Sequence, residues 1–292
     1  MTALLITNLK RTGMKLYKLI YLALFVFPLS LFAQEQTDTI APVEIEYAKP
    51  AFESTGLIDN QTDRVFSKGT IEFVMNHRFG LVTGTNDMIG VWGATNIRLG
   101  LSYSVTDRIT VGFGSTKDSR LQDFNLKAAI FKQTKDDKMP FNLTYYGNWT
   151  VNASPKEGFY HTSDRWSFYN QLIISRKVSK TISFQIAPSY SHYNRVDKTI
   201  KNDMPAFSAG GRYMFIPDIS LIVDATTPLM KYDQNTPKPG FGIGLEYGAV
   251  QHAFQLFISN SKGIVNQQNI MYNSNDFFNG EFMIGFNITK SW

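Results

Sequence analysis

The segment NIRLGLSYSVT, from Asn96 to Thr106, alternates between apolar and polar or small side chains at nearly every step. Its apolar members are Ile97, Leu99, Leu101, Tyr103 and Val105, and between them stand Asn96, Arg98, Gly100, Ser102 and Ser104. Successive side chains of a β-strand point to opposite faces, so this period of two predicts a strand with one apolar and one polar face.

The same alternation recurs in eleven further segments of the chain. With Asn96–Thr106 they give twelve predicted strands, an even number. Their apolar positions are Ile71/Phe73/Met75, Ile109/Val111/Phe113, Phe124/Leu126/Ala128/Ile130, Phe141/Leu143/Tyr145 with Trp149/Val151, Trp166/Phe168/Leu172/Ile174, Ile182/Phe184/Ile186, Phe207/Ala209/Tyr213/Phe215, Ile219/Leu221/Val223, Phe241/Ile243/Leu245/Tyr247, Phe254/Leu256/Ile258 and Phe282/Ile284/Phe286/Ile288.

The connections between the predicted strands alternate in length. Short turns are expected at 106–107, 135–138, 178–180, 217–218 and 248–251, and longer polar loops at about 80–95, 115–122, 152–164, 194–204, 228–239 and 260–276. Over an even number of strands this places all turns at one end, as in outer-membrane barrels with periplasmic turns and extracellular loops. The sequence therefore predicts an all-β fold, an antiparallel transmembrane barrel of about twelve strands in the outer membrane, with both termini in the periplasm.

The two faces of the predicted strands indicate which side meets lipid. A membrane barrel turns its apolar residues outward and keeps small and polar groups in the lumen. The polar face here is rich in glycine, which suits a crowded interior, and a closed barrel also pairs every backbone group in a medium without water. The expected surroundings of the apolar face are therefore the lipids of the outer membrane.

Charged residues on the polar face are the candidate lining of the lumen. They are Glu72, Arg78, Arg98, Asp123, Lys127, Arg165, Arg212, Asp224, Glu246 and Glu281, five cations and five anions. They could form charge rings that select ions across a pore, or a paired network that closes the lumen, since buried charges need partners. Balance between the two signs favours the network, and Glu72, on the preceding strand, is the expected partner of Arg98.

Residues 1–33 have the pattern of a signal peptide. Basic residues precede an apolar run from Leu19 to Phe32, which ends at Ala33 and is too short to cross a bilayer as a helix. Met14 is an alternative start. This leader contains four of the 29 Lys and Arg and no acid, so the rest of the chain has 25 basic against 24 acidic residues. Without a basic surface, a nucleic-acid partner is not expected.

Residues 34–68 show no sustained alternation and precede the barrel, which is expected over 69–292. They either remain in the periplasm or fold back into the lumen as a plug. None of the loops is expected to be long enough to form a large inward constriction.

Residues that could carry chemistry are few. The chain has no cysteine, and no cofactor or metal-ligand cluster is indicated. His161 and Ser163, with Asn170 to orient the histidine, resemble the catalytic set of outer-membrane phospholipases, but a polar loop accounts for them more simply. Gly240-x-Gly242-x-Gly244 lies within a predicted strand, which excludes a dinucleotide loop. The segment Asn266–Asn275 could bind a sugar or an ion, although a solvated loop is the simpler interpretation.

Several segments resemble an uncharacterised outer-membrane β-barrel family of the Bacteroidota. They are His77-Arg78-Phe79-Gly80, Asn96-Ile97-Arg98-Leu99-Gly100, Leu121-Gln122-Asp123-Phe124-Asn125-Leu126-Lys127, Ala187-Pro188-Ser189-Tyr190 and Asn287-Ile288-Thr289. The resemblance covers about residues 52–292. It implies the location and the fold, and it supplies neither a substrate nor catalytic residues.

The C-terminal strand and the whole pattern together suggest a function class. Ile284, Phe286 and Ile288 alternate up to the final Trp292, which resembles the signal read by the outer-membrane barrel assembly machinery. A passive channel or small-solute transporter of unknown substrate is the leading expectation, because no catalytic motif stands out. A structural or accessory barrel with a sealed lumen is the alternative, and an outer-membrane lipid hydrolase is a remote one.

Overall fold

The structure of the protein is a computed structural model, which describes residues 45–155 and 159–292. The expected leader, 1–33, and the alternative start at Met14 lie outside the described residues. Among those that are described, no helix is both long and apolar enough to cross a membrane.

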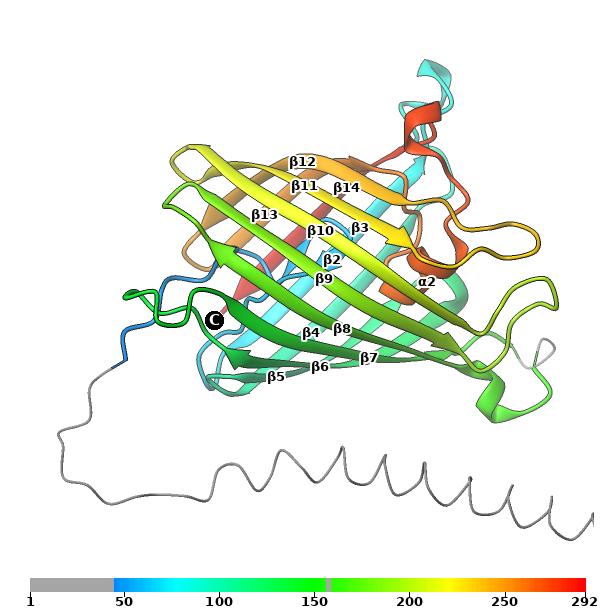
Figure 1. The fold of residues 1–292 in the computed structure, drawn as a ribbon. Helices are drawn as coiled ribbons and strands as arrows, with labels where there is room; N and C mark the ends of the chain where they lie inside the picture. Colours follow the sequence, from blue (N-terminus) through cyan, green and yellow to red (C-terminus); the bar gives the residue numbers. More distant parts are fainter. Residues whose placement is uncertain (1–44, 156–158) are drawn as a thin grey trace, which may run out of the picture. The chain divides into compact units, whose positions relative to one another are not determined.

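Twelve antiparallel strands form a closed barrel, which confirms the predicted fold class (Figure 1). Each strand pairs with its neighbours in sequence, and the last strand, β14, closes the ring against β3. The strands are β3 (Ile71–Leu81), β4 (Asn96–Thr106), β5 (Ile109–Thr116), β6 (Leu121–Phe131), β7 (Asn142–Asn152), β8 (Trp166–Lys177), β9 (Ile182–Tyr193), β10 (Asp203–Ile216), β11 (Ile219–Pro228), β12 (Gly240–Ala249), β13 (His252–Ser259) and β14 (Met283–Ser291).

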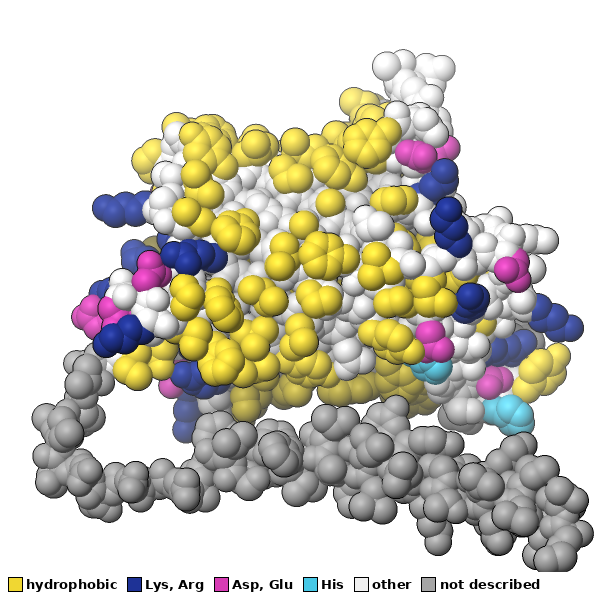
Figure 2. All heavy atoms as spheres, in the orientation of Figure 1, with side chains coloured by type: hydrophobic (Ala, Val, Ile, Leu, Met, Phe, Trp, Pro, Cys, Tyr) yellow, Lys and Arg dark blue, Asp and Glu magenta, His cyan; other side chains and the backbone are white. Residues whose placement is uncertain are grey.

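Side chains alternate across the barrel wall as the sequence predicts. On β4, Leu99, Leu101 and Tyr103 are exposed on the outside, whereas Asn96 and Ser104 are buried. Hydrophobic side chains cover the side of the barrel that Figure 2 shows, and charged side chains gather at its two ends. This belt is the surface that a membrane barrel presents to lipid.

The prediction that turns and loops alternate strictly in length is wrong at two places. The β5–β6 connection on the loop side covers only residues 117–120, while the β6–β7 connection on the turn side covers 132–141. The longer turn has a structural role, because Tyr47 bridges Thr134 and the N–H of Lys135 donates to the carbonyl of Glu46 at 2.9 Å. The β6–β7 connection therefore pairs with the N-terminal segment through backbone hydrogen bonds.

The N-terminal segment enters the barrel as a hairpin. Strands β1 (Gly56–Leu57) and β2 (Asn60–Gln61) form a two-stranded sheet within it, and every residue of 51–63 is buried or half-buried. We call residues 51–63 the lumen hairpin; β2 is labelled behind the near strands in Figure 1.

The β13–β14 loop also folds inward. It contains the helix α2 (Asn266–Tyr272), whose Asn266, Gln267, Ile270 and Met271 are buried. The expectations that no loop constricts the lumen and that 266–275 is a solvated loop are therefore wrong. The same loop also contains the 3-10 turn η5 (Phe277–Asn279), and further 3-10 turns lie in other connections: η1 (Thr85–Asp87), η2 (Asp118–Arg120) and η4 (Thr162–Arg165).

Candidate channel lumen and its occluding hairpin

The stem of the lumen hairpin is held by two oppositely charged wall residues. The Thr55 hydroxyl donates to Glu72 Oε1 at 2.7 Å, and Lys127 Nζ donates to the Thr55 carbonyl at 2.8 Å. Both charged side chains are buried. Their charges lie inside the barrel, where each has a hydrogen-bonding partner on the hairpin, as buried charges require.

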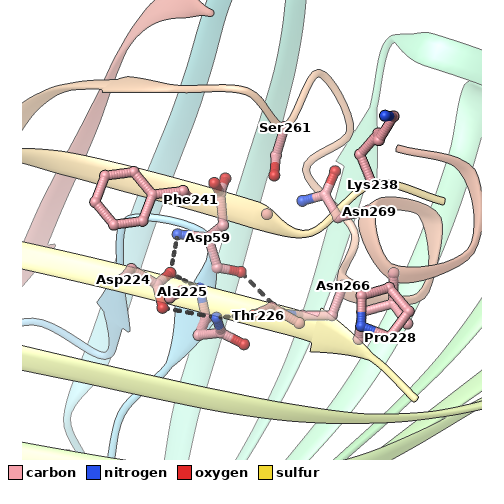
Figure 3. Close-up of a pocket in the computed structure, with 13 residues that line it drawn as sticks. Asp59, Asp224, Ala225, Thr226, Pro228, Lys238, Phe241, Ser261, Asn266 and Asn269 are labelled. Carbon is pink, nitrogen blue, oxygen red and sulfur yellow. Dashed lines mark hydrogen bonds between the residues drawn. The ribbon is translucent and has the colours of Figure 1, made fainter. Parts of the chain in front are cut away.

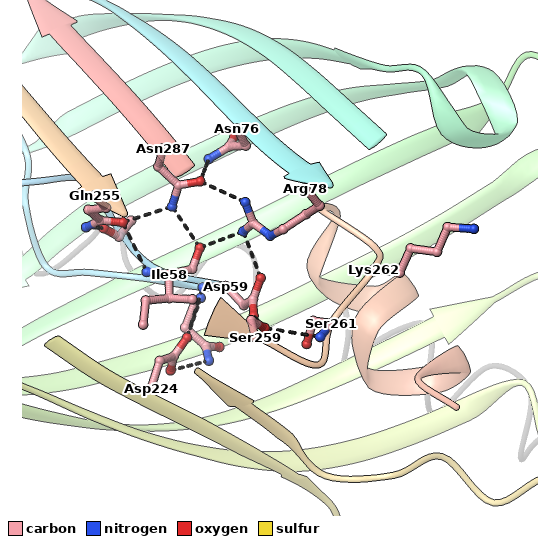
Figure 4. A network of polar contacts seen from close by, with 12 residues as sticks. Ile58, Asp59, Asn76, Arg78, Asp224, Gln255, Ser259, Ser261, Lys262 and Asn287 are labelled. Atoms are coloured by element: carbon pink, nitrogen blue, oxygen red, sulfur yellow. Dashed lines mark hydrogen bonds and ion pairs between the residues drawn. The ribbon is translucent and has the colours of Figure 1, made fainter. Parts of the chain in front are cut away.

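Polar side chains of β3, β13 and β14 hold the hairpin tip (Figure 4). Arg78 Nη2 donates to the Ile58 carbonyl at 3.0 Å and forms an ion pair with Asp59 at 2.8 Å. Asn287 Nδ2 donates to the same carbonyl at 2.9 Å, and Gln255 Oε1 accepts from the Ile58 N–H at 3.2 Å. Both backbone groups of Ile58 are thus satisfied by the wall.

Asp224 on β11, two strands beyond β13 in the barrel, also binds the tip (Figure 3). Its Oδ2 accepts from the N–H groups of Asp59 and Asn60, each at 3.0 Å, and its Oδ1 accepts from Asn60 Nδ2 at 2.7 Å. Asn60 also donates to Thr226 at 2.7 Å. One buried carboxylate therefore satisfies three donors of the turn, and hydrogen bonds to a charged acceptor are the strong kind.

Glycines in the wall make room for the apolar side chains of the hairpin. A Cβ on Gly242 would lie 2.8 Å from Ile58 Cγ2, and one on Gly210 would collide with Leu57. Leu57 and Ile58 pack in a small apolar cluster with Phe52, Ile222 and Phe257. The glycine-rich polar face thus accommodates a second layer of protein inside the barrel.

The turn of the hairpin is strained. Ile58 has a φ of 54°, in the left-handed region, which costs a β-branched residue about 1–2 kcal/mol. Such a conformation persists only where the surroundings hold it. The contacts of Arg78, Asn287, Gln255 and Asp224 provide that support.

Helix α2 closes the lumen nearer the loop end. Gln267 Nε2 donates to Asn148, Thr150 and Ser167 of the wall at 3.1, 2.9 and 3.3 Å. On its other side, the helix packs into an apolar cluster inside the barrel, made of Tyr146, Tyr169, Ile173, Ala187, Met204, Ala206, Tyr232, Ile270 and Met271. The hairpin and α2 together fill the middle of the lumen.

Cavities lie at both ends of the barrel, beyond the hairpin and α2. One of about 770 Å³ at the loop end is lined by Trp92, Lys262, Gln268 and Tyr272 among others, and one of about 320 Å³ lies at the same end. Another, of about 280 Å³ at the turn end, is lined by Arg212 and Glu53 with neighbouring groups. Both mouths of the barrel are therefore hollow, and the hairpin and α2 separate them.

Comparison with known protein families shows the family to which the chain belongs. Residues 52–292 match the family model described as membrane bound beta barrel domain (DUF5777). The chain belongs to this family. The match confirms the expected membrane β-barrel family, and its range begins within the lumen hairpin.

Solved structures with a similar fold are outer-membrane porins and channels. The NanC porin is 11% identical, with 75% of this chain and 98% of that chain covered and a TM-score of 0.49. The KdgM porin is 10% identical, with 76% and 99% covered and a TM-score of 0.45. An outer membrane channel from Pseudomonas putida F1 is 12% identical, with 87% and 100% covered and a TM-score of 0.48. Among curated proteins no relative matches.

Eight of the ten predicted lumen charges lie inside this membrane-bound barrel. Four form hydrogen bonds with the hairpin, namely Glu72, Arg78, Lys127 and Asp224. The other four pair with one another: Arg98 with Asp123, and Arg212 with Glu246 at 2.9 Å. Arg212 also forms an ion pair with Glu53 of the hairpin at 3.7 Å.

The expectation that Glu72 is the partner of Arg98 is wrong. Arg98 Nε and Nη2 donate to the two oxygens of Asp123 at 2.8 and 2.6 Å, a bidentate pair. In the β3–β4 register Arg98 lies opposite Asn76, while Glu72 lies opposite Ser102. Its guanidinium instead extends toward β6 over Gly114, where a Cβ would collide with it.

Two of the predicted lumen charges belong to loops instead. Arg165 ends η4, where its Nη1 donates to the carbonyls of Asn152 and Ser154, both at 2.7 Å. Glu281 precedes β14 and accepts from the Asp276 N–H at 2.6 Å. Both residues stabilise local loop structure. The prediction of a lumen position is wrong for them because each precedes the strand to which the alternation was extended.

The remote hydrolase set is not assembled in the described structure. Among the described residues, no hydrogen bond joins His161, Ser163 and Asn170 to one another. Asn170 lies on β8, where its Oδ1 accepts from the Tyr145 hydroxyl at 2.6 Å. The His161 N–H donates to the Asp164 carboxylate at 3.0 Å and lowers the pKa of Asp164. These loop residues serve as a turn cap.

Sequence reasoning missed Thr55, Asp59 and Asn60 of the hairpin and Gln267 of α2. The hairpin turn consists of Ile58 and Asp59, which lacks the Asn-Gly or Asp-Gly pair that marks two-residue hairpins. Gln267 stands in a run of amides, which resembles a polar loop. No local signal distinguished these positions.

Proposed function

We propose that the protein is an outer-membrane channel for small polar solutes that the lumen hairpin and α2 keep closed in this conformation. The observation that carries the proposal is the nature of the wall behind the hairpin. It presents charged and amide side chains such as Arg78, Gln185, Asp224 and Gln255, so removal of the hairpin would uncover a hydrophilic passage.

The hairpin contacts suit a movable closure. The hydrogen bonds that hold it join polar side chains of the wall to both its backbone and its side chains, and water can replace these partners when the hairpin leaves. The strain at Ile58 also favours its release. A passage would then connect the two hollow mouths once α2 moves as well.

Charges on the wall suggest weak ion selectivity for the open channel. Four cations and four anions line the lumen: Arg78, Arg98, Lys127, Arg212, Glu72, Asp123, Asp224 and Glu246. Strong selectivity is usually associated with rings of one sign. We therefore propose uncharged or weakly charged polar solutes as the substrate class.

The orientation and partners follow from the same proposal. The apolar belt would contact outer-membrane lipid, with loops outside and both termini in the periplasm. Trp292 would present the end of β14 to the barrel assembly machinery; its N–H donates to the Ile71 carbonyl at 3.0 Å, beside the seam that closes the barrel.

A barrel with a permanently sealed lumen is the second candidate. The apolar cluster around Ile270 and Met271 favours it, because burying such side chains stabilises α2 in place. In that case the protein would act as a structural or accessory component, with no solute passing through it.

Conductance in planar bilayers separates the two candidates. A channel should show intermittent openings with the purified full chain, and Asn60→Ala, which removes the side-chain bonds to Asp224 and Thr226, should raise the open fraction. Asn125→Ala is the matched control, because Asn125 is a lumen amide that contacts Asp123 and not the hairpin. Absence of openings in all three proteins would support the sealed barrel.

A further inference from the structure

The lumen hairpin and α2 come from opposite ends of the barrel and meet inside it. Asn266 Nδ2, in the first turn of α2, donates to the Asp59 carbonyl at the hairpin tip at 2.8 Å (Figure 3). The two segments are more than 200 positions apart in the sequence. This bond is a direct link between the N-terminal segment and the β13–β14 loop.

The contact between the two segments is polar and loosely packed. Cavities of about 20 and 40 Å³ remain beside it, and both are lined by Asp59, Asn60 and Asn266. Volumes of this size have room for water beside polar groups. The two segments are therefore joined by the hydrogen bond from Asn266 to Asp59.

The hairpin tip depends on support from its surroundings. Its left-handed residue, Ile58, is followed directly by Asp59, whose carbonyl α2 holds and whose carboxylate Arg78 holds. A strained turn persists only while its neighbours fix it. Loss of the α2 contact should therefore weaken the docking of the whole tip.

Helix α2 also borders the cavity of about 770 Å³ at the loop end. Gln268, Asn269 and Tyr272 of the helix line this cavity, opposite Trp92 of the β3–β4 loop. A solute that enters the cavity touches α2 before it can reach the hairpin. The helix is therefore placed between the loop-end cavity and the hairpin tip.

We propose that α2 is a latch on the lumen hairpin, so that displacement of α2 at the loop end releases the hairpin at the other end. The inference rests on one part of the proposed function, namely that the hairpin can leave its docked position. Such coupling is reciprocal, because two segments that stabilise each other gain the same free energy from their contact.

Thiol accessibility tests the latch directly, since the chain has no cysteine of its own. Ser54→Cys places a reporter on the hairpin at a position that is 3% exposed, and its rate of reaction with a water-soluble maleimide reports undocking. Asn266→Ala should raise this rate about fivefold, the change expected for loss of one buried hydrogen bond.

A second variant moves α2 without touching the hairpin. Gln267→Ala removes the bonds from α2 to the wall, and it should also raise the labelling rate of Ser54→Cys several-fold. The matched control is Asn273→Ala, which follows α2 and donates to the carbonyls of Lys238 and Pro239. It should leave the rate unchanged. Heat-modifiable gel mobility verifies that each variant retains the barrel.

The reciprocal experiment uses a reporter on α2. Met271→Cys, at a site that is 1% exposed, should react faster when Asn60→Ala loosens the hairpin. If Asn60→Ala frees residue 54 while Asn266→Ala and Gln267→Ala do not, the two stoppers are independent and the latch is overturned. If no variant, Asn60→Ala included, makes residue 54 reactive, the hairpin does not undock, and the proposed channel mechanism fails together with the latch.

Discussion

Asp224 is the wall residue whose loss should free the lumen hairpin most strongly. The residue is 2% exposed, and its carboxylate accepts three hydrogen bonds from the turn, two from backbone N–H groups and one from the Asn60 amide. Asp224→Ala removes the acceptor and leaves the two N–H groups of Asp59 and Asn60 without that partner.

The magnitude follows from the kind of bond that is lost. A hydrogen bond to a charged group contributes about 1.5–3 kcal/mol, and three of them that share one acceptor do not add fully. Removing the buried carboxylate also relieves its own desolvation, which opposes the loss. A net change of about 3 kcal/mol in the docking free energy is expected, and it corresponds to about a 100-fold rise in the undocked population.

The labelling rate of Ser54→Cys measures that population. In the Asp224→Ala background the rate should rise by about two orders of magnitude, while the barrel remains folded by gel mobility. Asp123→Ala is the matched control: it removes another buried wall carboxylate, which binds Arg98 and not the hairpin. It should destabilise the barrel without a comparable rise in labelling. A rise of less than threefold in Asp224→Ala would refute the assigned role of Asp224.

Three further predictions concern the wall and the C-terminus. Arg98→Ala should lower the temperature at which the gel mobility shifts, because it leaves Asp123 buried without its partner, at a cost of about 3–5 kcal/mol; an unchanged temperature would argue against the pair. Gly242→Val should force the Ile58 side chain away and so raise labelling of the hairpin reporter, and unaltered labelling would show that the close approach has no consequence. Deletion of Trp292 should reduce the amount of barrel recovered from outer membranes, and full recovery would disprove its role in assembly.

The sequence predicts the wall of the barrel well because the wall obeys a local rule. Lipid outside and a polar lumen inside impose a period of two on every strand, so segments such as Asn96–Thr106 report their own structure. The twelve strands and the face of each follow from that pattern. Residues beyond the strand ends do not follow it, so the alternation does not place Arg165 and Glu281 correctly.

The contents of the lumen obey no such rule. The position of Asp59 beside Arg78 and Asp224 depends on contacts between residues 19 and 165 positions apart, which no periodicity encodes. Likewise, Arg98 binds Asp123 on β6 because Gly114 on β5 leaves space for its guanidinium. Pairing inside the barrel is set by the three-dimensional register and by available volume.

A reversible lock on the lumen hairpin tests the central claim most directly. The hydroxyls of Ser54 and Thr289 are 3.2 Å apart, so the double variant Ser54→Cys/Thr289→Cys can form a disulfide between the hairpin and β14. Ser104→Cys/Thr110→Cys is the control, since these hydroxyls lie 3.0 Å apart on neighbouring wall strands. In planar bilayers the oxidised hairpin lock should be silent, and its reduction should restore the openings of the unmodified protein, while the control pair conducts in both states. Openings of normal frequency through the fully oxidised hairpin lock would contradict the account.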